Sequence, residues 1–110
     1  MERSDLVEAL TAAGLSRKAA AIYLSLLGKR KMTVSDIAHE SETKRATCYE
    51  HIDALLALDF IVRVPVGKRM YYAAVSPKKI FDALRKKVDY FENRMPRMLE
   101  IHDEAVQKPK

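Results

Sequence analysis

Basic and hydroxyl side chains gather at the start of one predicted helix, Thr43–Leu58, whose sequence is TKRATCYEHIDALLAL. At 3.6 residues per turn, this segment has an apolar side and a polar side. The apolar side consists of Cys48, Ile52, Leu55 and Leu56. The polar side begins with Lys44, Arg45 and Thr47, which can donate hydrogen bonds to phosphate oxygens or base edges. The pattern indicates an anchored helix whose first turn contacts nucleic acid.

Arg45 is the strongest candidate for reading a base. In a helix that enters the DNA major groove, a guanidinium near the N-terminal end can donate two hydrogen bonds to guanine O6 and N7, worth about 1–3 kcal/mol of discrimination. Lys44 is better placed to neutralise phosphate, Thr47 can donate to a base or to the backbone, and Thr43 is counted with them. Tyr49 is expected to pack its ring, with phosphate contact as a minor role. The alternative is a solvated helix end.

A shorter helix, Thr33–Glu40, is predicted to precede this segment, with Ser41 and Glu42 as the tight connection. Thr33 is the expected N-cap, and Asp36 three residues later gives a weak capping box. Helix, short turn and helix is the arrangement that lays a second helix into the major groove.

Two further helices are predicted upstream. Ser4 is expected to cap the first, and Gly14 to stop it. Ser16 caps the second, Arg17–Leu27, which ends at Gly28. Its apolar residues are too numerous for a surface helix, so it should be the central packing helix. They are Ala20, Ile22, Tyr23, Leu24, Leu26 and Leu27.

A basic triplet, Lys29-Arg30-Lys31, follows the central helix. Such a triplet in a loop is usually solvated, and the alternative is that it reaches phosphate, for which Lys31 is the candidate. Met32 and Thr33 are expected to add a very short strand.

From Phe60 the pattern changes to β-branched and aromatic runs, Ile61–Val64 and Met70–Val75. They flank Pro65–Arg69, which predicts a β-hairpin with a basic tip. Appended to a helix-turn-helix, such a hairpin is a wing. Lys68 and Arg69 at its tip could reach the adjacent minor groove or its phosphates. An ordinary polar turn is the alternative.

Ser76 and Pro77 start a last helix, in which apolar residues recur at alternating intervals of three and four. These residues are Phe81, Leu84, Val88, Phe91, Met95, Met98, His102 and Ala105. The spacing is typical of a coiled-coil seam, so we expect dimerisation through this helix. Packing of the helix back onto its own domain is the alternative.

Two parts of this last helix should depart from regularity. Pro96 should kink or break it near Arg94–Met95, because proline removes a backbone donor and crowds the preceding turn. The basic tail, residues 107–110, should fray.

Length and composition limit the number of domains, the type of partner and the cellular location that we expect. A chain of 110 residues is one domain's worth, so no effector-binding domain is expected. The net charge of +5 favours an anionic partner, although it is spread along the chain, with +2 in residues 1–75 and +3 in residues 76–110. With no signal peptide and no long apolar run, we expect a cytoplasmic, nucleoid-associated protein without a membrane span.

No cofactor, metal or catalytic activity is expected. The three histidines are scattered without metal-ligand spacing, and no phosphate loop or nucleophile motif occurs. Cys48, the one cysteine, is expected to be a buried core residue, with a redox switch as the alternative.

The sequence resembles the TrmB-like winged-helix transcriptional regulators. The resemblance extends from about Leu6 to Val75 through the motifs LTAAGLSRKAAAIYLSLL, TVSDIAHES, KRATCYEHI and DFIVRV. It implies a DNA-binding domain, usually dimeric, whose helix carrying Arg45 and Thr47 enters the major groove. At Glu42 and Asp59, relatives commonly have glycine, so a positive backbone dihedral is expected there.

The expected fold is mainly α with a small β-hairpin (α+β). Residues 1–75 should form a winged helix-turn-helix DNA-binding domain, and residues 76–110 a dimerisation helix forming a coiled coil. The expected function is that of a homodimeric, sequence-specific regulator that binds double-stranded DNA. A protein-interaction module and a non-specific nucleoid-associated DNA-binding protein are the alternatives.

Overall fold

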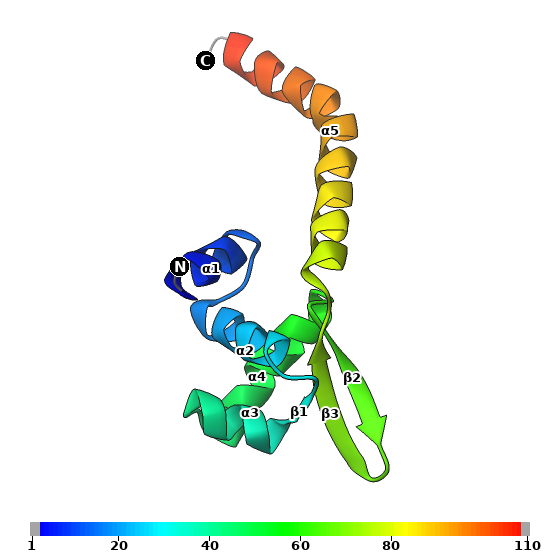
Figure 1. Ribbon diagram of the computed structural model, residues 1–110. Helices are drawn as coiled ribbons and strands as arrows, with labels where there is room; N and C mark the ends of the chain where they lie inside the picture. The colour runs from blue at the N-terminus through cyan, green and yellow to red at the C-terminus, as the bar shows by residue number, and fades with distance from the viewer. Residues whose placement is uncertain (1–2, 109–110) are drawn as a thin grey trace. The chain divides into compact units, whose positions relative to one another are not determined.

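The computed structural model describes residues 3–108 and is mostly helical, with one small antiparallel sheet (Figure 1). Its elements in chain order are α1 (Arg3–Ala12), α2 (Arg17–Leu27), β1 (Met32–Thr33), α3 (Val34–Ser41), α4 (Arg45–Ala57), β2 (Ile61–Val66), β3 (Arg69–Ala74) and α5 (Pro77–Gln107). The chain divides into two compact units, one ending at Ser76 and the other beginning at Pro77. The predicted fold class is confirmed.

Helix α2 forms the centre of the first unit. Ser16 caps it as expected, its hydroxyl accepting a hydrogen bond from the Ala19 backbone N–H at 3.1 Å. The buried side chains are Ala19, Ala20, Ile22, Tyr23, Leu24 and Leu26. Leu27, one of the six apolar residues noted in the sequence, is 41% exposed at the last residue of the helix. The Tyr23 hydroxyl donates to the Val75 carbonyl at 2.7 Å, which links the core to the end of the wing.

Helix α1 contacts α2, but none of its own residues is buried. It already includes Ser4, so the expectation that Ser4 caps this helix is wrong. Gly14 has a φ of 113°, a conformation that a side chain would strain, and the chain turns there toward the buried Leu15.

The sheet has the order β1-β3-β2, with Met32 opposite Tyr72 and Val66 opposite Arg69. The wing turn therefore contains only residues 67 and 68, and the predicted tip was too long. Pro65 lies within β2, where its missing N–H is tolerated because β2 is an edge strand.

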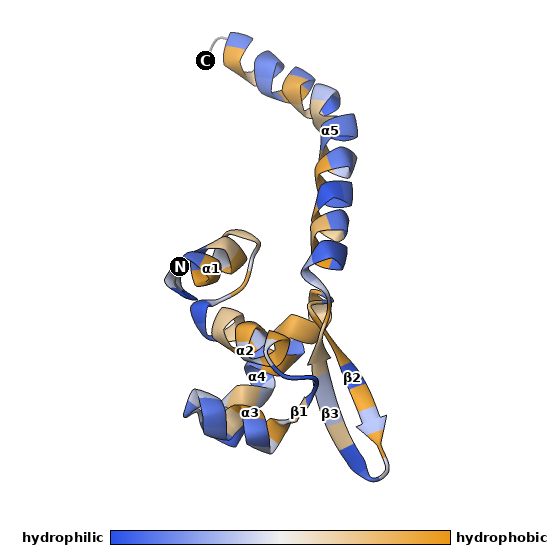
Figure 2. Ribbon diagram, in the orientation of Figure 1, coloured by the Kyte–Doolittle hydropathy of each residue, from blue (hydrophilic) through white to orange (hydrophobic). Residues whose placement is uncertain are grey.

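Helix α5 continues through Pro96 without interruption, although the ribbon bends in that part of the helix (Figure 1). The expected kink is therefore present and the expected break is not. Hydrophobic residues recur along α5 between hydrophilic ones (Figure 2). Ile80, which the seam did not include, is the one residue of α5 that is buried. The last two residues of the tail expected to fray lie outside the described part of the chain.

Candidate nucleic-acid interface

A complete capping box fixes the start of α3. The Asp36 backbone N–H donates to Thr33 Oγ1, and the Thr33 backbone N–H donates to Asp36 Oδ2, each at 3.1 Å. The hydrogen bond from the Thr33 backbone, followed by that from its side chain, lowers the pKa of the Asp36 carboxyl. The first turn of α3 is thus held by side chains that the sequence predicted.

The connection between α3 and α4 depends on a left-handed residue. Glu42 caps α3 with φ 52° and ψ 43°, and Asp59 after α4 has φ 62°, so both predicted positive dihedrals are confirmed. The backbone N–H of Thr43 donates to the Ala38 carbonyl at 3.0 Å, and the Thr43 hydroxyl donates to the Ser41 carbonyl at 3.1 Å. These bonds close the turn between α3 and α4.

Helix α4 begins at Arg45, two residues later than predicted, because Thr43 bonds the turn and Lys44 takes the N-cap position. The inner side of α4 is secured by Cys48, Ile52 and Leu55, each 0% exposed. Cys48 is therefore a core residue as expected, 4.0 Å from the Ser41 hydroxyl. Lys44, Arg45 and Thr47 remain exposed on the outer side.

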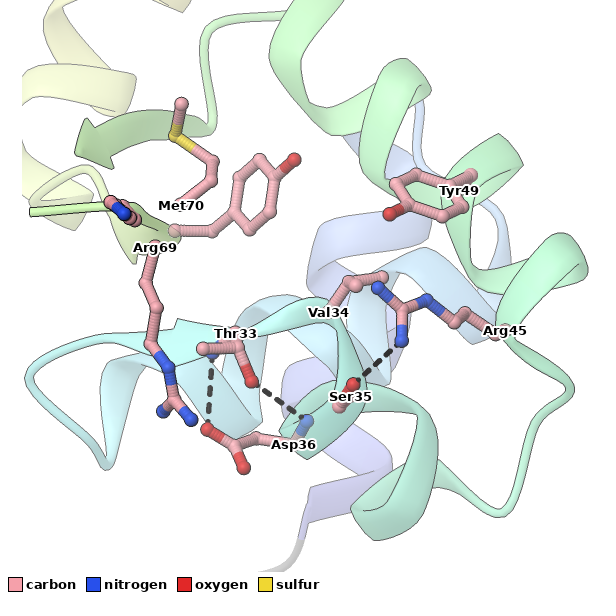
Figure 3. Close-up of a pocket in the computed structure, with 10 residues that line it drawn as sticks. Thr33, Val34, Ser35, Asp36, Arg45, Tyr49, Arg69 and Met70 are labelled. Atoms are coloured by element: carbon pink, nitrogen blue, oxygen red, sulfur yellow. Dashed lines mark hydrogen bonds between the residues drawn. The ribbon is translucent and has the colours of Figure 1, made fainter. Parts of the chain in front are cut away.

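A pocket of about 390 Å³ lies where the first turn of α3, the first turns of α4 and the wing meet (Figure 3). Its lining residues are Thr33, Val34, Ser35, Asp36, Arg45, Tyr49, Lys68, Arg69, Met70 and Tyr72. Cationic side chains stand on two of its walls, Arg45 on α4 and Lys68 and Arg69 on the wing. An anionic group that entered this pocket would be approached by cations from both sides.

One hydrogen bond crosses from α4 to α3 inside this pocket. The Arg45 guanidinium donates through Nη1 to the Ser35 hydroxyl at 2.9 Å, and the two side chains point toward each other (Figure 3). Arg69 extends toward Asp36 on the opposite side, and its charge contributes to lowering the pKa of that carboxyl. The two arginines therefore have different neighbours, a neutral hydroxyl and a carboxylate.

The structure brings together four of the eight predicted DNA contacts, namely Arg45, Tyr49, Lys68 and Arg69. Lys44, the N-cap of α4, and Thr47 in its first turn are exposed but do not line the pocket. The Lys31 ammonium does not line the pocket and lies over the Tyr71 ring, 5.1 Å from its centroid.

Sequence reasoning missed the contribution of α3. Ser35 and Asp36 come from its first turn, and Met70 and Tyr72 from the strand beyond the wing turn. The capping box did signal that this turn is ordered. Nothing in the spacing alone indicated that Ser35 faces Arg45, since that depends on how α3 and α4 cross.

The described residues, 3–108, contain no helix that is long and apolar enough to cross a membrane. Within that same range, no three His, Cys, Asp or Glu side chains are placed to hold a metal ion.

Several solved structures share this fold. TrmBL2, described as an archaeal chromatin protein with a novel mode of DNA binding, has a TM-score of 0.71 and 24% identity over 96% of this chain. The chain spans 39% of the length of TrmBL2. A possible transcriptional regulator from Methanosarcina mazei Go1 has a TM-score of 0.66 and 15% identity, over 91% of this chain and 88% of its own.

A further similar structure is that of S. aureus MepR in complex with DNA, with a TM-score of 0.59 and 17% identity, over 89% of this chain and 86% of its own. No curated protein sequence matches the chain significantly.

Residues 10–78, more than half of the chain, match the model of the family described as the sugar-specific transcriptional regulator TrmB. This match begins near the first quoted motif, includes the helix-turn-helix and ends just after the wing. The resemblance seen in the sequence is thereby confirmed. The chain belongs to the TrmB family of transcriptional regulators, and its fold is that of the winged-helix structures described above.

Proposed function

We propose that this chain is a sequence-specific regulator that binds double-stranded DNA as a homodimer, with α4 in the major groove and the wing on the adjacent backbone or minor groove. The observation that carries the proposal is the pocket between α3, α4 and the wing, which sets Arg45 opposite Lys68 and Arg69. A helix that enters the major groove and a basic hairpin on the other side of the same open space suit a duplex whose backbone runs between them.

The two cationic walls are proposed to have different duties. Arg45 lies in the first turn of a helix and has a planar fork of donors, which suits the major-groove edge of guanine. Lys68 lies in a two-residue turn and has a point charge on a flexible stem, which suits phosphate whatever the sequence. Base discrimination is thus assigned to α4 and general affinity to the wing.

Homodimerisation is proposed for α5. Its seam leaves large apolar side chains in water in the single chain, with Phe81 and Phe91 each 57% exposed and Val88 59% exposed. A row of exposed apolar side chains of this kind marks an association surface. A second copy suits it because two winged units need a tether to reach half-sites about 34 Å apart.

The test compares Arg45→Ala with Lys68→Ala on two duplexes, one selected by the wild-type chain from random DNA and one of scrambled sequence. Arg45→Ala should weaken binding mainly to the selected duplex, by about 5-fold to 150-fold, which corresponds to the loss of one bidentate base contact. Lys68→Ala should weaken both equally and reduce the salt slope by about 0.9 for the phosphate lost. Equal losses on both duplexes for both variants would contradict base reading by α4.

Non-specific coating of DNA is the second candidate. One observation favours it, the similarity to TrmBL2, which is described as a chromatin protein. Full wild-type affinity on the scrambled duplex would decide for this candidate. A chain that shifts no duplex at low salt would exclude both.

A further inference from the structure

Ser35 lies at the second position of α3 and accepts a hydrogen bond from Arg45 Nη1 at 2.9 Å, ten residues along the chain. Both side chains line the pocket between α3, α4 and the wing, where Figure 3 shows the guanidinium turned toward the hydroxyl. Neither family membership nor the expected base contact accounts for this bond.

We propose that Ser35 is a positioning residue that sets the direction of the Arg45 guanidinium and thereby contributes to base specificity. This inference rests on the proposed function, since it concerns the residue to which base reading is assigned. Ser35 itself would touch no base.

The donors of the guanidinium support this division of work. Arginine has five N–H groups in a rigid plane, and the bond to Ser35 uses one of them, at Nη1. The edge formed by Nε and Nη2 keeps its donors, and two parallel donors are what the O6 and N7 atoms of guanine accept. Nη1 of Arg45 can therefore bond to Ser35 while the edge with Nε and Nη2 faces DNA.

The acceptor is itself held in place. Ser35 follows Val34, which is buried, and precedes Asp36, whose carboxylate is bonded to the Thr33 backbone N–H at 3.1 Å. The first turn of α3 is thus tied to the core on one side and to the capping box on the other. Arginine has many rotamers, so a fixed acceptor reduces the freedom that Arg45 must lose when DNA binds.

The chemical nature of the group that accepts from Arg45 matters as well. A carboxylate at this position would neutralise the guanidinium and compete with DNA, whereas the Ser35 hydroxyl leaves its charge intact. The carboxylate of Asp36, one residue away, is already engaged by Thr33 and lies toward Arg69. Arg45 therefore keeps its full charge for DNA while its direction is fixed.

The test is a double-mutant cycle on the selected duplex, with Ser35→Ala, Arg45→Ala and the double variant. Removing the hydroxyl should weaken binding about threefold to tenfold, the range expected for one hydrogen bond. In the Arg45→Ala background the same change should have no further effect, because the two residues act through one contact. Ser35→Thr, which keeps the hydroxyl, should restore wild-type binding, and Ser4→Ala, an exposed serine of α1, is the control for hydroxyl loss elsewhere.

Base preference gives a readout that a merely structural role would not change. Ser35→Ala should reduce discrimination at the same base pair that Arg45→Ala affects, and at no other. A loss that is equal on selected and scrambled duplexes, or that persists undiminished in the Arg45→Ala background, would overturn the proposal and make Ser35 an independent phosphate contact.

A measurement without DNA separates this inference from the proposed function. In ¹⁵N NMR spectra of the free protein, the Arg45 Nε–H resonance should show an ordered side chain that Ser35→Ala releases and Ser35→Thr retains. A mobile Arg45 in the wild type would overturn the positioning role even if DNA binds. If the wild type shifted no duplex, the proposed function would fail and the specificity role with it, and an ordered resonance would then support the contact alone.

Discussion

The winged-helix unit and the long helix α5 differ in where their apolar side chains go. In the first unit, Tyr23, Leu26 and Ile52 are at most 2% exposed, and buried residues come from every element except α1. In α5, one residue of 31, Ile80, is buried. The same kinds of side chain therefore serve a core in one region and face water in the other.

This difference teaches that the two regions draw their stability from different sources. A buried core stabilises the first unit within one chain, at about 25 cal/mol per Å² of apolar surface removed from water. A helix gains most of its stability from packing its apolar face against something else. The order of α5 is therefore expected to depend on a partner, and hence on protein concentration, whereas that of the first unit is not.

The largest expected effect is the loss of the dimer when the seam is charged. With Phe91→Asp and Met95→Asp together, a dimer would contain four carboxylates in an apolar interface, each costing several kcal/mol when unpaired. Sedimentation equilibrium should give the mass of a single chain at concentrations where the wild type has twice that mass.

Asn93→Asp is the control, because this exposed residue adds a carboxylate to the same helix outside the seam. Its mass should equal that of the wild type. A double variant that keeps the wild-type mass would rule out α5 as the interface.

The next largest effect should come from the core of the first unit. Ile52 on α4 is 0% exposed, so Ile52→Ala should lower the free energy of unfolding by about 2–5 kcal/mol, measured by urea denaturation followed by circular dichroism. Val62 on the wing is 47% exposed, and Val62→Ala should change the same quantity by less than about 0.5 kcal/mol. Comparable losses for the two variants would contradict the placement of the core.

The sequence predicted the fold of both regions well, because their signals are local. Periodicity located α2, α3 and the strands, the capping residues Ser16 and Thr33 were identified, and the missing glycines at 42 and 59 indicated positive dihedrals. The errors arose where a local signal was overridden. Pro65 was interpreted as a turn residue, although an edge strand accepts proline.

The candidate site was less predictable than the fold. Arg45 and Lys68 could be named from charge and position, but the bond between Arg45 and Ser35 depends on how two helices cross. Nothing in a one-dimensional spacing of ten residues encodes that crossing. The apolar seam of α5 was clear from its spacing, but the spacing does not encode the surface that would pack against it.

A smaller effect on stability should follow from relieving backbone strain in the turn between α3 and α4. Glu42 has a φ of 52°, which costs a residue with a Cβ about 1–2 kcal/mol. Glu42→Gly should raise the free energy of unfolding by about 0.5–1 kcal/mol, since part of the relief is offset by the greater freedom of glycine in the unfolded chain.

Glu50→Gly, at an exposed position inside α4, is the control and should lower the same free energy by about 1 kcal/mol. If glycine at 42 destabilised the protein as glycine at 50 does, the left-handed turn would not be a source of strain.

The smallest expected effect is on stability at low pH, and it also concerns the first unit. Hydrogen bonds from Thr33 lower the pKa of Asp36 in the folded chain, so the unfolded chain binds the proton more readily. The contribution of this carboxylate is therefore present above the unfolded pKa, about pH 4, and is lost as the pH falls through the lower folded value. Asp36→Asn should flatten the decline of the urea midpoint below about pH 4, because asparagine can still accept from the Thr33 backbone but does not titrate there. Parallel curves for the variant and the wild type would show that the capping box, which holds Ser35 and the pocket wall in place, does not depend on that charge.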